Sequence, residues 1–260
     1  EKLSRTDAEA FFDTYYNASN LTIGIAGDVD PDRMRTLAEK YFSRLPRGEE
    51  PPSVRTEEPR QFGERRVVLR EQVRPRLMVG YSRPSMYSPD DPVYRVLADV
   101  LAGGRTSRFH KRLVQTEKAL AVQIPSYFAE FPGGKYENEF ALLAFPNRGV
   151  SPDSLEHDIY DVLEAVKEEG ITQEELERAK NRARDEFIGQ LDSNQGLAQQ
   201  FAQAEALTGD WRSVFETLEE IEAVTVDDVQ RVARETFRAS KRTVAIMKSS
   251  DDGAPTVSAN

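Results

Sequence analysis

The apolar positions of the chain recur at helical spacing in some segments and gather into short runs in others. Residues 6–17 and 31–45 carry apolar side chains at a period near 3.6, which predicts an amphipathic helix in each segment. Pro31 stands at a first-turn position of the second helix. Between the two, the apolar run LTIGIAGD (21–28) predicts a buried strand.

The pattern continues beyond residue 63. Four segments have the alternation or apolar clustering of β-strands: 64–72, 74–84, 120–131 and 137–146. Helical spacing is found at 91–102, at 106–119 and in several pieces from Pro152 to Phe237, and KRTVAIMK (241–248) is a closing strand. PGGKY (132–136) predicts a hairpin loop. This order favours an α+β fold with helices packed on one face of a mainly antiparallel sheet.

A stretch of different composition separates the two parts. PRGEEPPSVRTEEPRQFG (46–63) has four prolines, two glycines and many charges, so it carries too little apolar surface to pack. The predicted organisation is therefore a first part at 1–45, a linker at 46–62, a domain at 63–250 and a disordered tail at 251–260.

The start and the end of the chain resemble each other. Aligned without a gap, DAEAFFDTYYNASNLTIGIAG and DVQRVARETFRASKRTVAIMK share five residues at a constant offset of 221 positions. The pairs are Asp7 with Asp228, Ala18 with Ala239, Ser19 with Ser240, Thr22 with Thr243 and Ile25 with Ile246. Chance is one explanation, because helix-turn-strand units are alike. The other is a duplicated domain whose first copy lacks its beginning here.

Composition excludes several classes of protein. The net charge of −10 argues against a nucleic-acid or anionic-membrane surface, because phosphate binding needs clustered Lys and Arg. No apolar run reaches the 18 or more residues of a membrane span. The chain has no cysteine, so disulfides, thiolate metal sites and Cys nucleophiles are excluded.

Candidate chemistry is sparse. The two histidines, His110 and His157, are 47 residues apart, whereas a helix-borne zinc pair needs i, i+4 spacing. His157 and Asp161 share a helix face, which is more typical of a solvated pair than of a metal site. G-x-S-x-G is absent, and AGGRTSR (102–108) lacks the spacing of a phosphate loop. The residues alone predict a noncatalytic domain, with no catalytic, cofactor-binding or metal-binding residue.

Several stretches, taken in order, carry a resemblance. YYNASNLTIGIAGDVDPDRMRTLAEKYFSRLP, GERRVVLREQVRPRLMVGYSRPS, LADVLAGGRTSRFHKRLVQTEKALAVQIPSYF and EEGITQEELERAKNRARDEFI are similar to the insulinase/pitrilysin family of zinc peptidases. They most resemble its bacterial members akin to the mitochondrial processing peptidase. The resemblance implies two homologous α+β domains, of which residues 1–45 would end the first and 63–250 would form the second.

The resemblance also accounts for the missing chemistry. The inverted zinc motif of the family, H-x-x-E-H, lies early in the first domain, upstream of Glu1. Zinc is therefore expected in that missing domain and no cofactor in this chain. The full-length protein is then expected to be a zinc metalloendopeptidase, with this chain inactive alone.

A second family feature can be placed on the sequence. Active second halves carry an Arg and a Tyr, about seven residues apart, that hold the substrate backbone and stabilise the oxyanion. The matching positions here are Val114 and either Ala121 or Val122. Arg112 and Tyr127 lie nearby but out of register. Such a chain fits the zinc-bearing partner of a two-chain enzyme, and it equally fits an inactive paralogue.

The expected function follows from the resemblance. The main hypothesis is the noncatalytic C-terminal portion of a zinc metalloendopeptidase, forming the wall of a chamber that admits unfolded peptides. The alternative is a catalytically inactive structural or binding subunit of a processing complex. Expected partners are an unfolded peptide substrate and a homologous second subunit in a dimer, and the resemblance suggests an exported, periplasmic setting.

Overall fold

The computed structural model describes residues 3–55, 59–125 and 132–249. The chain divides into two compact units. One unit comprises Glu1–Pro59 with Arg184–Leu218, and the other comprises Arg60–Ala183 with Glu219–Asn260. The first is called the small unit and the second the sheet unit.

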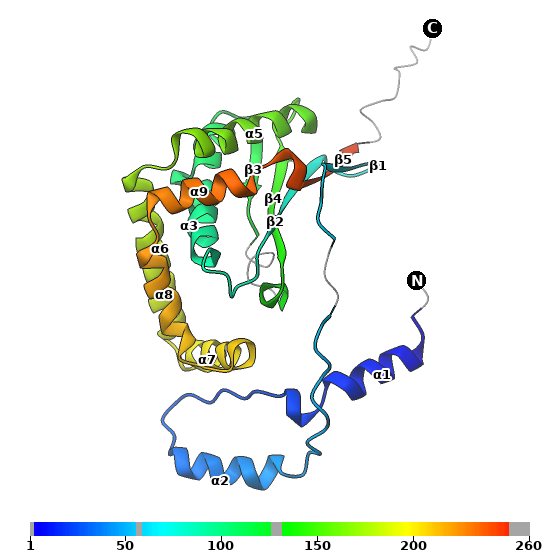
Figure 1. The fold of residues 1–260 in the computed structure, drawn as a ribbon, viewed down its shortest axis with the longest axis vertical. Coiled ribbons are helices and arrows are strands. Elements are labelled where there is room, and N and C mark those ends of the chain that lie inside the picture. The colour runs from blue at the N-terminus through cyan, green and yellow to red at the C-terminus, as the bar shows by residue number, and fades with distance from the viewer. Residues whose placement is uncertain (1–2, 56–58, 126–131, 250–260) are drawn as a thin grey trace. The chain divides into compact units, whose positions relative to one another are not determined.

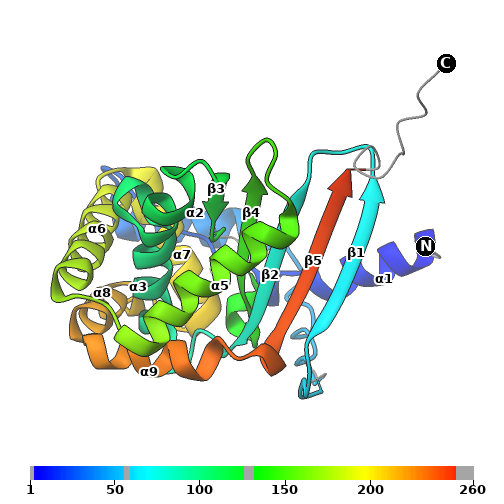
Figure 2. The ribbon, with the colours of Figure 1, turned by 90° about the horizontal axis from the view of Figure 1, so that it is seen from above.

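The sheet unit is built on five strands (Figure 2). They are β1 (Arg65–Glu71), β2 (Arg76–Arg83), β3 (Ala119–Gln123), β4 (Asn138–Pro146) and β5 (Arg242–Ser249). Their order in the sheet is β1-β5-β2-β4-β3, and each pairing is antiparallel except that of β1 with β5. The last strand of the chain therefore lies between the first two.

Helices of the sheet unit cover one face of this sheet (Figures 1 and 2). They are α3 (Asp91–Ala102), α5 (Pro152–Glu169) and α9 (Val226–Thr236). The strand side chains beneath them are buried, among them Leu77, Val79, Leu142, Val244 and Ile246. Full burial of each such apolar side chain contributes about 1.5–3 kcal/mol. The predicted α+β fold is confirmed.

Local sequence explains where the longest of these helices begins and ends. Ser151 caps α5 by accepting a hydrogen bond from the backbone N–H of Ser154 (3.1 Å), and Pro152 occupies the first turn. The helix stops at Gly170, whose φ of +75° is readily adopted only without a Cβ.

The small unit is helical. It contains α1 (Arg5–Tyr15), α2 (Pro31–Phe42), α7 (Asn194–Thr208), the end of α6 (Gln173–Leu191) and the start of α8 (Ser213–Ala223). Four aromatic rings pack together in it, those of Phe187, Phe201, Trp211 and Phe215, with centroids 5.2–6.5 Å apart. Segment 21–26 lies against α7, because a Cβ on Gly24 would come within 2.1 Å of the carbonyl oxygen of Ala198.

The helix of the internal repeat occurs twice. Helix α1 begins with a capping box between Ser4 and Asp7, and α9 begins with one between Thr225 and Asp228, at the same offset of 221. A short 3₁₀ turn follows each helix, at Ala18–Asn20 and Ala239–Lys241. Both segments therefore contain the predicted helix and turn.

The strand predicted after each helix occurs only after the second, so the prediction that both segments form the same helix-then-strand unit is wrong. Residues 241–248 enter the sheet as β5, whereas the strand predicted at 21–28 is wrong. The backbone is extended at Leu21, but no described strand pairs with this segment, and Ile23 and Ile25 are about half exposed. A strand needs a hydrogen-bonded neighbour, which a local apolar run cannot supply.

Two further predictions need correction. The helix expected at 106–119 is a 3₁₀ turn at Gly104–Thr106 followed by a helical stretch that ends as a π-helix at His110–Val114. Glu117, with a φ of +57°, ends it before β3. The strand expected at 120–131 is β3, which runs from Ala119 to Gln123, and residues 126–131 lie outside the described residues. The tail predicted at 251–260 also lies outside the described residues. The predicted domain boundaries stay a prediction.

Candidate functional site

The sheet face away from α3, α5 and α9 is the candidate functional surface. Alternation along the strands places Met78 of β2, Leu143 and Phe145 of β4, and Met247 of β5 on this face. All four are half-buried, whereas their apolar strand neighbours on the helix-covered face are buried. This set of side chains is called the open face.

The open face extends to both edges of the sheet. At one edge it includes Val67 and Leu69 of β1, which are 51% and 49% exposed. At the other edge it includes Ala121 of β3, which pairs with Phe145. Apolar side chains this exposed on several neighbouring strands suit contact with another polypeptide.

The two positions matched to the family's Tyr lie on opposite faces. Ala121 is half-buried on the open face, while Val122 pairs with Ala144 and is buried among the helices. Of the two alternatives, only Ala121 has the orientation from which a side chain reaches the open face. A methyl group there donates no hydrogen bond.

The position matched to the family's Arg ends the π-helix. Val114 is half-buried, and the N–H of Gln115 bonds to the carbonyl of His110 at 2.8 Å, the i to i+5 pattern. π-Helical turns are frequent at functional sites. Arg112 lies on the same segment and is exposed, and Tyr127 lies outside the described residues.

A largely buried ion pair between Arg108 and Glu175 holds the π-helical segment in place. Arg108 directs Nε and Nη2 at the two carboxylate oxygens of Glu175, at 2.9 and 2.8 Å, and Nη2 also reaches the carbonyl of Gly170 at 2.9 Å. Burial alone would raise the pKa of Glu175. Hydrogen bonds from Arg108 and from the Thr172 backbone outweigh it and lower the pKa to about 2. The pair joins the segment after the Gly-Gly turn to the start of α6.

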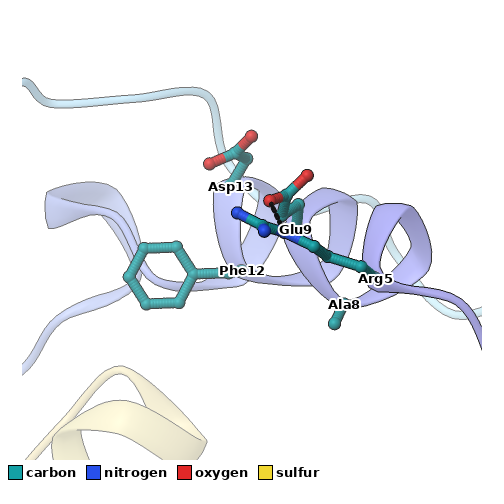
Figure 3. A pocket seen from close by; sticks show the side chains of 5 residues that line it. All are labelled: Arg5, Ala8, Glu9, Phe12 and Asp13. Atoms are coloured by element: carbon teal, nitrogen blue, oxygen red, sulfur yellow. Dashed lines mark hydrogen bonds and ion pairs between the residues drawn. The ribbon is translucent and has the colours of Figure 1, made fainter.

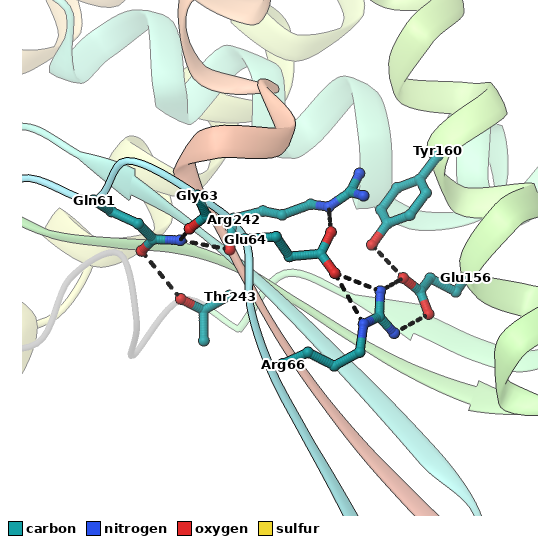
Figure 4. A network of polar contacts seen from close by, with 8 residues as sticks. All are labelled: Gln61, Gly63, Glu64, Arg66, Glu156, Tyr160, Arg242 and Thr243. Atoms are coloured by element: carbon teal, nitrogen blue, oxygen red, sulfur yellow. Dashed lines mark hydrogen bonds and ion pairs between the residues drawn. The ribbon is translucent and has the colours of Figure 1, made fainter.

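A second network fixes the end of the linker and the edge strand (Figure 4). Arg66 of β1 binds both Glu156 of α5 and Glu64, and Arg242 of β5 binds Glu64 at 2.5 Å. Tyr160 donates to Glu156 at 2.6 Å and lies under the Arg242 guanidinium, 4.1 Å from ring centroid to Cζ. All charges in this cluster are paired, so we interpret it as structural.

A buried charge cluster in the helix-covered layer is also structural. Arg83 of β2 is 3% exposed and pairs with Asp91 at the start of α3, which also accepts from Arg95 at 3.0 Å. Tyr94 lies under the Arg83 guanidinium and bonds to Thr236 of α9 at 2.6 Å. Burial lowers the pKa of Arg83. No periodicity in the sequence signals this cluster.

The histidines do not assemble a metal site. His110 is half-buried in the π-helix, and His157 and Asp161 are exposed on α5. Among the described residues, no group of three His, Asp or Glu side chains could hold a metal ion. Zinc sites use three or four protein ligands, so the described residues do not fit zinc.

A shallow hollow on α1 carries no chemistry (Figure 3). It is lined by Arg5, Ala8, Glu9, Phe12 and Asp13, all exposed residues of that one helix. Arg5 and Glu9 form an i, i+4 ion pair at 2.7 Å. This is the expected surface of an exposed helix.

Comparison with known proteins identifies the family. The peptidase M16 inactive domain matches residues 2–183. The chain belongs to this family. The expected resemblance is thereby confirmed, and the chain is a noncatalytic peptidase M16 domain.

Curated relatives of this M16 inactive domain carry zinc protease names. The chain is 28% identical to the zinc protease PqqE of Helicobacter pylori over 93% of its own length and 54% of the relative. It is also 28% identical to the uncharacterized zinc protease Rv2782c of Mycobacterium tuberculosis, over 89% of its length and 52% of the relative. The chain thus spans about half the length of the curated relatives it matches.

Solved structures share the fold. A protease from Helicobacter pylori has a TM-score of 0.79 at 24% identity, covering 95% of this chain and 60% of that one. A peptidase M16 inactive domain from Pseudomonas fluorescens has a TM-score of 0.76 at 18% identity, covering 100% of this chain and 59% of that one. In the described parts of this chain, no helix is both long and apolar enough to cross a membrane.

Proposed function

We propose that this M16 inactive domain forms one wall of a chamber in which a zinc endopeptidase holds unfolded peptides. The observation that carries the proposal is the open face, where half-buried apolar side chains lie on neighbouring strands, on the side of the sheet that α3, α5 and α9 do not cover. Apolar contact of this kind is non-directional, so it suits peptides of varied sequence. Zinc and its general base are proposed to come from a separate domain.

The positions matched to the family's Arg and Tyr suggest a division of labour. Val114 and Ala121 supply no hydrogen-bond donor from their side chains. Loss of one donor that stabilises an oxyanion typically costs about 100- to 1000-fold in turnover. We propose that a homologous second subunit brings an Arg and a Tyr to the peptide.

A cross-linking experiment tests the chamber wall. The chain has no cysteine, so Leu143→Cys on the open face and Asp161→Cys on α5 each create a unique label site. In the longer protein that contains this chain, any cysteine outside these 260 residues is replaced first, and a photoreactive maleimide is attached to the introduced thiol. On irradiation with an unstructured peptide, we expect the peptide to couple to the labelled Leu143→Cys variant. Equal coupling to Asp161→Cys, the matched control, would contradict the proposal that the open face lines the chamber.

An activity assay tests the division of labour. The longer protein, loaded with zinc, is expected to cleave an unstructured peptide slowly alone and faster with a related chain that carries the Arg and Tyr. Robust turnover that the second chain leaves unchanged would overturn this proposal.

The alternative is a catalytically inactive subunit, which the same lack of donors at Val114 and Ala121 favours equally. Activity in neither arm of the assay would support it. An exported, periplasmic setting is proposed on the resemblance alone.

A further inference from the structure

The outer edge of β1 is an unused pairing surface. β1 is the outermost strand of the sheet, with β5 on one side, and no described residue pairs with its other side. All seven of its residues, Arg65–Glu71, are exposed. Every second residue of an edge strand directs its backbone N–H and C=O outward, where they can form a ladder with another strand.

The side chains along this edge follow a distinct order. Arg65 comes first, then the apolar residues Val67, Val68 and Leu69, which are 45–51% exposed, and then Arg70. Neither Arg65 nor Arg70 has an ion-pair partner among the described residues, in contrast to the fully engaged Arg66 on the same strand. Arg74, just past the strand, is also exposed and without a described carboxylate partner.

The positive charge of this edge contrasts with the net negative charge of the chain. The chain has a net charge of −10, yet residues 65–76 contain five arginines and one carboxylate, Glu71. A second copy of β1 is a poor occupant, because antiparallel pairing of two such strands would bring arginines near arginines. An extended segment with carboxylates at both ends and apolar residues between them would match both the charges and the apolar stretch.

We propose that the outer edge of β1 binds an extended acidic polypeptide segment, which adds to the sheet as a sixth strand. Its carboxylates pair with Arg65 at one end and with Arg70 and Arg74 at the other. Its central apolar residues pack beside Val67 and Val68, one on each face. The backbone ladder supplies affinity and the flanking charges supply selectivity.

Binding of short peptides tests this edge directly. The probe is a fluorescent seven-residue peptide with two glutamates, three valines and two glutamates in that order, titrated with the 260-residue chain. We expect saturable binding, together with slower amide hydrogen exchange over residues 65–71. One control peptide replaces the glutamates by lysines. Another replaces two adjacent central valines by proline, so that a ladder N–H is removed in either register.

Charge reversal provides the matched variants. Arg65→Glu with Arg70→Glu should weaken binding on the order of tenfold, since each exposed ion pair contributes modestly and reversal adds repulsion. Arg33→Glu with Arg35→Glu changes the net charge equally on α2, in the other unit, and should leave binding unchanged. Circular dichroism on each variant verifies that it is folded.

Several outcomes would overturn the proposal. One is no saturable binding of the glutamate peptide, which would mean that the arginines only protect the edge from pairing. Equal binding of the proline peptide would mean charge attraction without an added strand. Concentration-dependent dimerisation with slow exchange at 65–71 in the absence of peptide would assign the edge to a second copy. Each readout is independent of peptidase activity and therefore of the proposed chamber.

Discussion

Arg66 of β1 and Glu156 of α5 form a two-point ion pair, with Nη1 2.9 Å from Oε2 and Nη2 2.5 Å from Oε1. The two residues are 90 positions apart in the sequence. The pair connects the edge strand to the helix layer. Glu156 is 5% exposed, so its carboxylate depends on this partner for compensation.

Removal of this ion pair should destabilise the sheet unit. We expect Arg66→Met to lower the free energy of unfolding by about 1–3 kcal/mol, because a buried carboxylate loses charged hydrogen bonds. Arg65→Met is the matched control, since Arg65 is on the same strand, exposed and without an ion-pair partner among the described residues. Urea unfolding of both variants measures the difference, and equal midpoints would contradict the structural role of the pair.

Glu175 should make stability depend on acid pH. Its pKa in the folded chain is about 2, below the ordinary 4.5, so the stabilisation is complete above about 4.5 and is lost as pH falls toward 2. We expect Glu175→Gln to be less stable than the wild type at neutral pH, by about 1–3 kcal/mol. The gap between the two should narrow below pH 4.5.

The control for this pH effect is the adjacent Glu174→Gln. Glu174 is 83% exposed and, among the described residues, pairs only with Arg178 on the helix surface. Thermal unfolding across the acid range should find that its stability stays close to that of the wild type. A gap for Glu175→Gln that stays constant from neutral pH to pH 2 would contradict the assigned pKa.

The two capping boxes should differ in their importance. Thr225→Ala removes the cap of α9, which packs on the sheet and buries Val229 and Val232, and we expect a loss of about 1 kcal/mol in the stability of the sheet unit. Ser4→Ala removes the equivalent cap of α1, which has no buried residue, and should only increase fraying of that helix. Amide hydrogen exchange, measured separately for α1 and α9, distinguishes the effects of the two substitutions. Equal losses of sheet-unit stability in Thr225→Ala and Ser4→Ala would contradict this prediction.

The sequence predicted what local periodicity and end signals determine. The helix at 91–102 and the start of a helix at Pro152 coincide with the structure, because apolar spacing and proline act within one turn. The sequence left the family's Tyr position open between Ala121 and Val122, and it did not show which of the two side chains lies on the open face. The pairing of Ala121 with Phe145 places Ala121 on the open face.

Longer-range relations were beyond the sequence. The insertion of β5 between β1 and β2, and the ion pair between Arg108 and Glu175 across 67 positions, depend on tertiary pairing that no local pattern encodes. For the same reason the apolar run at 21–28 was expected as a strand. Its composition fits a strand, but no described strand pairs with it.

We predict that this M16 inactive domain holds no zinc of its own. It has two histidines, which are separated, and no cysteine, and no described group of three ligands is arranged to hold a metal. The most direct test is elemental analysis of the purified 260-residue chain after dialysis against micromolar zinc. We expect far less than one zinc per chain. About one tightly held zinc per chain would contradict the claim.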